Sequence, residues 1–339
     1  MTAAPAEAAT QKKKDQTVEL RVGSFNVKSV HHDPKARGAH LPWNQRRAAV
    51  IADILGERAD VVGLQETHQS YNYAPRLLDG RNQYLDLRNG LNKAGGSYEL
   101  TNDVPQNCLR EWTISKCVYT DRGASRNLRI LYDTRTLEAV RTGSHEYAVQ
   151  SGGLNDTRYM TWAIFRHRLS GEQFFFVNTH LINNFPDKQK AQWEELITEI
   201  ERRKGDLPVV VVGDFQRSRT KYPSNQMMVK MKKHGYGEVV GQKPNSLFLT
   251  KKPRAEKRVN AWMNTVNGFD RNIKNWSFNT DRKRKLGNYA DWIFASNHLR
   301  VSEWKVVVDR KKLQLNGVVP SDHNMVRATL HLPASSGSY

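Results

Sequence analysis

Apolar and polar positions along the chain predict strands interleaved with helices. In residues 18–26, Leu20, Val22 and Ser24 alternate with Glu19, Arg21 and Gly23, as in a strand with two different faces. Residues 60–66 form a short apolar run that ends in polar residues and predicts a buried strand. Between them, residues 43–58 are expected to be helical, because the apolar positions recur as one stripe: Val50, Ile51, Ile54 and Leu55. This strand–helix–strand order is typical of an α/β core.

The rest of the chain continues this pattern. A hairpin is predicted for residues 161–169 and 173–179, and a helix for residues 187–204, with Asp187 as its cap and Gly205 after its end. Further strands are predicted at 116–119, 127–132, 207–212, 290–295, 304–308 and 325–332. Residues 18–333 are expected to form a single domain, because no linker divides them. Small and polar residues predict disorder in segments 1–17 and 334–339.

The positive charge of the chain indicates a polyanion as a candidate partner. The formal net charge is +19, and a field of that size attracts polyanions. Residues 217–285 hold 18 Lys and Arg against four acidic residues, a net of +14, interleaved with aromatic residues. Cations beside exposed rings are typical of nucleic-acid binding, although some of these rings must belong to the core. The alternative is a basic surface that serves only solubility.

The two cysteines and the composition of the N-terminal segment provide evidence on where the protein resides. Cys108 and Cys117 are close enough in sequence to form a disulfide, which would indicate an oxidising compartment, but two free thiols are also compatible with the spacing. The small residues near the N-terminus resemble the start of a mature exported protein. We therefore expect secretion, with cytoplasmic residence as the alternative. No apolar run approaches the roughly 18–20 residues that a membrane span requires, so stable membrane insertion is not expected.

Polar residues recur where the predicted strands end or begin. Five of these positions are Asn26, Glu66, His180, Asp214 and Asp291. The pair Asp322-His323 precedes the last predicted strand. Any one of them could be a turn residue or a cap. Together they predict a site beside the strand ends, where a rigid scaffold positions the loops.

The order of these motifs resembles the endonuclease/exonuclease/phosphatase superfamily. The matching pieces are SFN at 24–26, GLQE at 63–66, NTHL at 178–181, GDFQ at 213–216, ADWIF at 290–294 and SDH at 321–323. They extend over nearly the whole chain. The resemblance implies an α/β fold of the DNase I-like type, a four-layer sandwich in which two packed mixed β-sheets are flanked by helices.

The resemblance also implies roles for these residues. Glu66 would be the main ligand of Mg²⁺ or Mn²⁺, with Asn26 and Asp322 in support, because such hard cations prefer oxygen donors. His323, oriented by Asp291, would accept a proton from water or bind phosphate. Asp214 would position or deprotonate the water. His180 would protonate the leaving oxygen or hold phosphate.

Substrate contacts are expected from a second set: Gln216, Arg158, Asn178, Arg282, Lys283, Arg284 and Lys285. Gln216 departs from the pattern, since the family usually has a shorter Asn there and the amide must sit elsewhere. The carboxylate that orients the second histidine in DNase I-like relatives is missing near Arg129, which leaves His180 a weaker role. Arg129 itself is expected on the surface.

The leading hypothesis is a metal-dependent phosphodiesterase, a nuclease that cuts DNA or RNA with little sequence preference. One alternative is a phosphoesterase for a phospholipid head group or a polyphosphorylated small molecule. A second is a catalytically impaired protein that binds polyanions.

Overall fold

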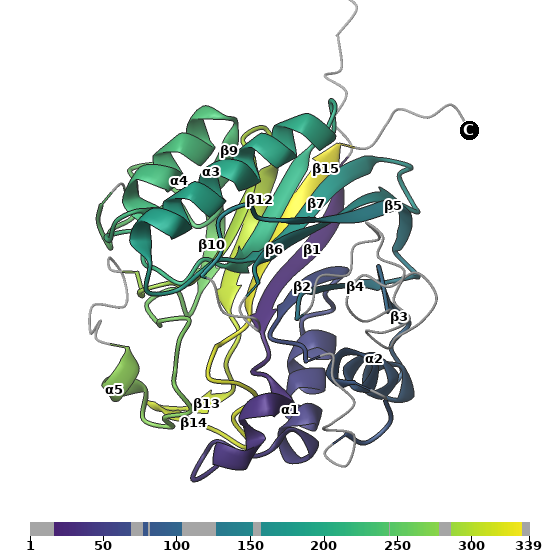
Figure 1. The fold of residues 1–339 in the computed structure, drawn as a ribbon, viewed down its shortest axis with the longest axis vertical. Coiled ribbons are helices and arrows are strands. Elements are labelled where there is room, and N and C mark those ends of the chain that lie inside the picture. Colours follow the sequence, from purple (N-terminus) through teal and green to yellow (C-terminus); the bar gives the residue numbers. More distant parts are fainter. Residues whose placement is uncertain are drawn as a thin grey trace, which may run out of the picture.

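Two β-sheets lie face to face, and helices cover their outer sides (Figure 1). The computed structural model describes residues 17–68, 77–80, 82–103, 127–151, 157–243, 245–277 and 286–333. The predicted strand at 116–119 and the pair Cys108 and Cys117 lie outside these residues. Within them, no helix is long and apolar enough to cross a membrane.

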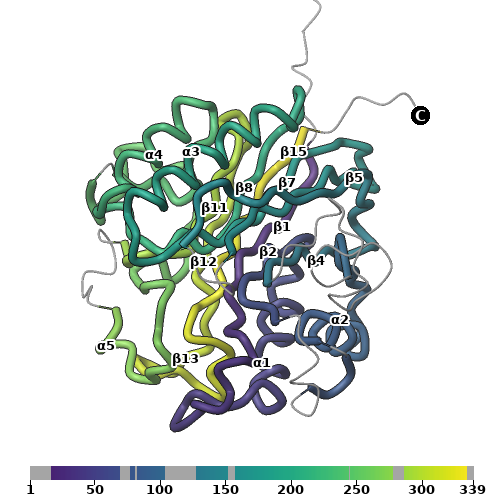
Figure 2. The backbone as a smooth tube through the Cα atoms, in the orientation of Figure 1, coloured from purple at the N-terminus to yellow at the C-terminus, as the bar shows by residue number. Residues whose placement is uncertain are grey.

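The first sheet has seven strands in the order β10-β12-β15-β1-β2-β4-β3. Their bounds are β10 Ala255–Val259, β12 Arg300–Val306, β15 Val326–Pro333, β1 Thr17–Asn26, β2 Val61–Gln65, β4 Arg129–Asp133 and β3 Tyr98–Leu100. The parallel pair β1 and β2 lies at its centre, and β15 runs antiparallel to β1. Figure 2 shows these early and late segments, purple β1 and yellow β15, running side by side.

The second sheet has six strands in the order β5-β6-β7-β8-β11-β9. Their bounds are β5 Leu137–Glu146, β6 Tyr159–His167, β7 Gln173–His180, β8 Val209–Asp214, β11 Asp291–Ser296 and β9 Tyr236–Glu238. Strands β7 and β8 are parallel, and β11 is antiparallel to β8. The predicted hairpin is confirmed as β6 and β7.

Helices form the outer layers. They are α1 Trp43–Gly56, α2 Gln83–Lys93, α3 Pro186–Arg203 and α4 Ser224–Lys233, whereas the short helices η1 Val30–Lys35 and α5 Ile273–Trp276 belong to connecting segments. Helix α3 begins after Phe185 with a proline in its first turn. Asp187 is therefore not its cap, and instead it accepts a hydrogen bond from the Tyr222 hydroxyl at 2.7 Å. A small sheet of β13 Arg310–Lys311 and β14 Gln314–Leu315 lies near α5 (Figure 1).

Strand alternation explains why there are four layers. On β1, Leu20 and Val22 belong to the core between the sheets, whereas Phe25 belongs to the core beneath α1 and α2. On β2, Val61 faces the first core and Val62 the second. Side chains at successive strand positions point to opposite faces, so a strand that is apolar on both faces must be covered on both. The predicted four-layer sandwich is confirmed.

The sheets approach each other closely at the end that carries the polar motifs. A Cβ atom on Gly63 would lie 2.4 Å from Cγ2 of Val212, so only glycine fits at that position of the GLQE motif. Strands β1, β2, β7 and β8 all end at this edge of the sandwich, and β11 and β15 begin there. Strand topology thus brings six separate sequence motifs to one place.

Candidate active site

The seven-stranded sheet contributes Asn26 and Glu66 at the ends of β1 and β2. The Asn26 amide donates to Glu66 Oε1 at 3.0 Å and to Asp214 Oδ2 at 3.1 Å. Glu66 Oε2 accepts from the Ser29 backbone N–H at 3.2 Å. Glu66 has a left-handed backbone, with φ of 59°, a conformation that costs a non-glycine residue energy and that clusters at functional sites. The carboxylate is thus fixed towards the centre of the site.

Asp322 lies in the loop before β15 and is paired with a lysine. Its Oδ2 is 2.7 Å from Nζ of Lys28, which follows Asn26 by two residues. The Ser321 hydroxyl donates to the Asn26 carbonyl oxygen at 2.7 Å and so ties this loop to the end of β1. Asp322 therefore reaches the site, as predicted, but its partner in the structure is a cation of the chain itself.

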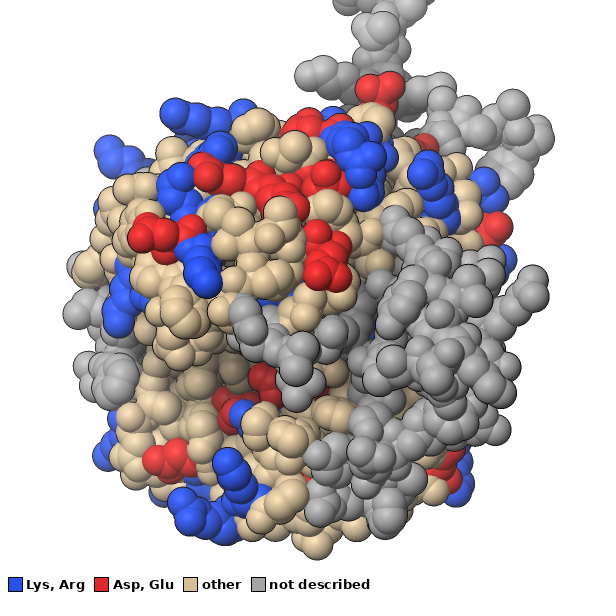
Figure 3. Space-filling view, in the orientation of Figure 1, with Lys and Arg blue, Asp and Glu red and all other residues tan. Residues whose placement is uncertain are grey.

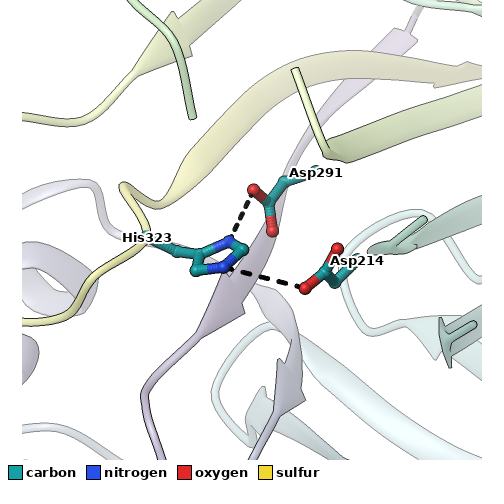
Figure 4. Close-up of side chains that lie close together, drawn as sticks. All are labelled: Asp214, Asp291 and His323. Carbon is teal, nitrogen blue, oxygen red and sulfur yellow. Dashed lines mark hydrogen bonds and ion pairs between the residues drawn. The ribbon is translucent and has the colours of Figure 1, made fainter. Parts of the chain in front are cut away.

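The six-stranded sheet contributes Asp214 and Asp291, which pair across β8 and β11. Figure 4 shows His323 between them. His323 Nδ1 lies 2.9 Å from Asp291 Oδ2, and its Nε2 lies 3.8 Å from Asp214 Oδ2. Both aspartates are fully buried. The predicted carboxylate–imidazole pair is therefore present, and it points its second nitrogen towards Asp214.

Gln216 fills the space beside His180. Its Nε2 lies 2.6 Å from His180 Nε2 and donates to Asp214 Oδ2 at 3.0 Å. The Gln216 backbone N–H donates to Asp214 Oδ1 at 2.8 Å, and its φ of 64° turns the chain back towards the site. The longer amide thus folds back on Asp214 and His180. His180 takes its orientation from this amide, with Asp214 Oδ2 at 3.5 Å from its Nε2.

Burial and neighbouring charges shift the pKa values of Asp214, His323 and His180 in different directions. Burial, followed by the charge of Asp291, raises the pKa of Asp214 to about 7 against the pull of His323. Burial alone would lower the pKa of His323, but Asp291 and Asp214 together raise it well above the usual 6.5. For His180, burial and then Arg158 lower the pKa well below 6.5. At neutral pH, His323 is therefore a cation and His180 is neutral.

The two carboxylates near Lys28 behave differently. Burial would raise the pKa of Glu66 and of Asp322, but nearby cations outweigh it and lower both. Lys28 is the leading cation for Glu66, and His323 followed by Lys28 for Asp322. Both carboxylates are therefore ionised at neutral pH and offer charged oxygens.

These residues fit a hard divalent cation at Glu66 and Asn26. Charged carboxylate and amide oxygens are the donors that Mg²⁺ and Mn²⁺ prefer. Asp214, Asp291 and His323 form a second group whose ligand atoms lie within 4.8 Å of one another. This group also suits proton transfer and phosphate binding, because Asp291 is hydrogen-bonded to His323 Nδ1 and the other ring nitrogen points towards Asp214.

Two other predicted contacts fare differently. Arg158 directly precedes β6, and its charge lowers the pKa of His180, which places it near the site. Asn178 does not face the site. It is fully buried, and its amide donates at 2.9 Å to the carbonyl oxygens of both Leu64 and Arg129. The prediction of phosphate binding by Asn178 is therefore wrong, because its amide joins the two sheets.

The remaining predicted residues concern the surface. Arg282, Lys283, Arg284 and Lys285 lie outside the described residues, so their phosphate contacts stay a prediction. Arg129 was expected on the surface but is fully buried, with its guanidinium 3.9 Å from the centre of the Tyr84 ring. Figure 3 shows the face that holds the site, with acidic side chains and a basic one at the bottom of a hollow.

Sequence reasoning missed two residues that shape the site. Nothing in the sequence around Lys28 indicates a role in the site, because its partner Asp322 is distant in sequence. Arg46 is fully buried, and its guanidinium donates to the carbonyl oxygens of Val27 and Lys28 at 2.5 Å and of Pro320 at 3.0 Å. It thereby clamps the loop after β1 to the loop before Asp322. One signal existed, since Arg46 precedes Val50 by four residues and so shares the apolar stripe of α1.

Comparisons with known proteins identify the family and the fold of the chain. The family model described as the Endonuclease/Exonuclease/phosphatase family matches residues 23–323. Nocturnin of Drosophila melanogaster is 25% identical over 207 residues, which are 58% of this chain but only 28% of that protein.

Solved structures that share the fold include the following two. The mannosyl-6-phosphatase of Bacteroides thetaiotaomicron is 17% identical, with a TM-score of 0.62 over 92% of this chain and 99% of the other. TDP2 of D. rerio, complexed with a single-strand DNA product, is 16% identical, with a TM-score of 0.53 over 92% and 98%.

Proposed function

Because this chain belongs to the endonuclease/exonuclease/phosphatase family, we propose that it is a divalent-metal-dependent hydrolase of phosphodiester bonds in nucleic acid. One observation carries the proposal. Asp291 is hydrogen-bonded to His323, and Asp214 lies 3.8 Å from the other ring nitrogen. This group lies directly beside the ionised carboxylate of Glu66, because the Asn26 amide donates to both Glu66 and Asp214. A proton acceptor, a phosphate-binding cation and a metal ligand are thus within reach of one scissile bond.

The residues divide the reaction between them. A divalent cation held by Glu66 and Asn26 would polarise the phosphate and offset charge on the leaving oxygen. Asp214 accepts a proton from the attacking water, because its pKa of about 7 suits a general base at neutral pH. His323, held as a cation by Asp291, binds a phosphate oxygen. As the water oxygen bonds to phosphorus, the bond from phosphorus to the leaving oxygen breaks.

Neutral groups and Arg158 complete the site. His180 and the Gln216 amide, 2.6 Å apart, form an uncharged contact beside Asp214 that can orient the water or a phosphate oxygen. Arg158 can bind phosphate oxygens through its guanidinium, which stays charged at all relevant pH values. Its influence on the pKa of His180 supports a place on the same side of the site.

Two features favour nucleic acid as the substrate. A net charge of +19 strengthens attraction to a polyanion much more than to a single phosphate group. Phe185 and Tyr222 are 45% and 38% exposed, and they lie in the segments that follow His180 and Gln216. Exposed rings near a phosphate site provide surfaces on which bases stack. Several other rings of the basic stretch are core residues: Tyr236, Trp262, Phe269 and Trp276.

Turnover assays test the proposal. The purified chain is incubated with plasmid DNA, single-stranded RNA, short-chain sphingomyelin and a sugar phosphate, each with Mg²⁺, Mn²⁺ or EDTA. We expect cleavage of DNA or RNA that requires the metal and that His323→Ala reduces at least about a hundredfold. His234→Ala, at the end of α4, is the control and should retain activity. Hydrolysis of only the lipid or the sugar phosphate would contradict the choice of substrate.

A further inference from the structure

Lys28 places a positive charge inside the candidate metal site. Its Nζ lies 2.7 Å from Asp322 Oδ2, and the two side chains are only 21% and 17% exposed. The ammonium thus contacts one of the two carboxylates that the sequence resemblance assigned to metal binding.

The backbone of Lys28 is held in place on both sides. Its N–H donates to Asn26 Oδ1 at 3.1 Å, and its carbonyl oxygen accepts from Gln83 Nε2 at 2.9 Å as well as from Arg46. The φ of Lys28 is 55°, the left-handed region that favours glycine, so these contacts must outweigh a local cost. These backbone contacts therefore fix the point from which the Lys28 side chain extends towards Asp322.

An ammonium in this place opposes metal binding at Asp322, because it occupies Oδ2 and leaves only Oδ1, which accepts from the Ser321 hydroxyl at 3.3 Å. Divalent cations bind carboxylate oxygens at about 2.0–2.6 Å, and an oxygen in contact with Nζ cannot accept a second cation from the same side. To let one in, Lys28 would have to leave and find another partner in a largely buried site, which is costly for a charge. The Glu66 oxygens instead accept from neutral donors, the Asn26 amide and the Ser29 backbone N–H, and Asn26 Oδ1 accepts from the Lys28 backbone N–H.

We propose that the site holds one divalent cation, at Glu66 and Asn26, and that the Lys28 ammonium at Asp322 takes the place of a second. This inference rests on the proposed function, because it concerns the number of metal ions in that site. Lys28 would then provide a resident positive charge for the phosphate, and only one ion would have to be acquired from solution.

Metal stoichiometry tests the proposal without an activity assay. Isothermal titration calorimetry with Mn²⁺ should give one ion per wild-type chain and two per Lys28→Met chain, because the uncharged side chain frees Asp322. Electron paramagnetic resonance of the Mn²⁺-loaded Lys28→Met protein should show two ions coupled to each other. Lys28→Arg keeps the charge and should bind one ion. Lys35→Met, an exposed lysine in η1, is the matched control and should also bind one.

The outcomes separate the two proposals. Two ions per wild-type chain, or one ion in a folded Lys28→Met protein, would overturn the role of Lys28 and leave the proposed hydrolase intact. No Mn²⁺ binding to the wild type would overturn both. The wild-type stoichiometry decides the matter even if Lys28→Met fails to fold, which thermal unfolding of each variant would reveal.

Discussion

The two sheets contribute carboxylates of opposite behaviour to the same site. On the six-stranded sheet, Asp214 has its pKa raised to about 7. On the seven-stranded sheet and its loops, Glu66 and Asp322 have their pKa values lowered. Burial acts in the same direction on all three, so burial does not account for the difference. The neighbouring charges account for it.

Each side has its own set of partners. Asp214 faces a second carboxylate, Asp291, with one histidine between them. The charge of Lys28 lowers the pKa of Glu66, whereas the pKa of Asp322 is lowered most by His323 and then by Lys28 and the buried Arg46. Like charges favour proton uptake and opposite charges favour ionisation. One half of the site is therefore suited to moving a proton and the other half to holding a cation.

Asp291→Asn should have the largest effect on the proton-moving half. Loss of the charge removes the partner that keeps His323 cationic and oriented, and general acid–base groups contribute about 10²–10⁴-fold to rates. We expect kcat/KM for nucleic-acid cleavage to fall about a thousandfold, while the melting temperature changes little. Asp187→Asn, which alters an aspartate bonded to Tyr222, is the control. Near-normal activity of Asp291→Asn would contradict the role of Asp291 in orienting His323 for the reaction.

The pH dependence of the rate should show the raised pKa of Asp214. A general base acts when unprotonated, so activity should be lost as the pH falls below about 7 and should level off above it. We expect kcat/KM to fall about tenfold per pH unit in this range, followed at saturating Mn²⁺. Circular dichroism at each pH would confirm that the chain stays folded. A profile that is flat from pH 5 to 8 would argue against Asp214 as the base.

Gln216→Ala should have the smallest effect. It removes one hydrogen bond to Asp214 and the amide beside His180, a loss of about 1–2 kcal/mol, so kcat/KM should fall about tenfold. Gln226→Ala, at an exposed position of α4, is the control and should match the wild type. A thousandfold loss from Gln216→Ala would mean that this amide touches the reacting atoms.

Motifs at strand ends were predictable because topology alone gathers them. Asn26, Glu66, Asp214 and Asp291 each end or follow a strand, or begin one, and these strands meet at one edge of the sandwich. Side-chain partners were not predictable in the same way. The pair Lys28 and Asp322 depends on two loops that only the folded sheet brings together.

The burial of polar residues was also not predictable from the sequence. Arg129 follows an apolar position and precedes another, which by alternation suggests an outward side chain. The structure buries it because α2 covers that face of β4 and places Tyr84 against the guanidinium. Asn178 likewise belongs to a motif of the family, but its amide donates hydrogen bonds to backbone carbonyl oxygens of the other sheet. Both outcomes depend on packing between elements rather than on local sequence.

Mn²⁺ binding by Glu66→Gln and Asp291→Asn tests the division of the site most directly. Isothermal titration calorimetry should show that Glu66→Gln weakens Mn²⁺ binding at least about a hundredfold, because a charged ligand is lost. Asp291→Asn should bind Mn²⁺ within about threefold of the wild type, although it is nearly inactive. Equal loss of Mn²⁺ binding in both variants would mean that both halves of the site hold the ion, and it would contradict their separation. Loss in Asp291→Asn alone would place the ion at Asp214, Asp291 and His323.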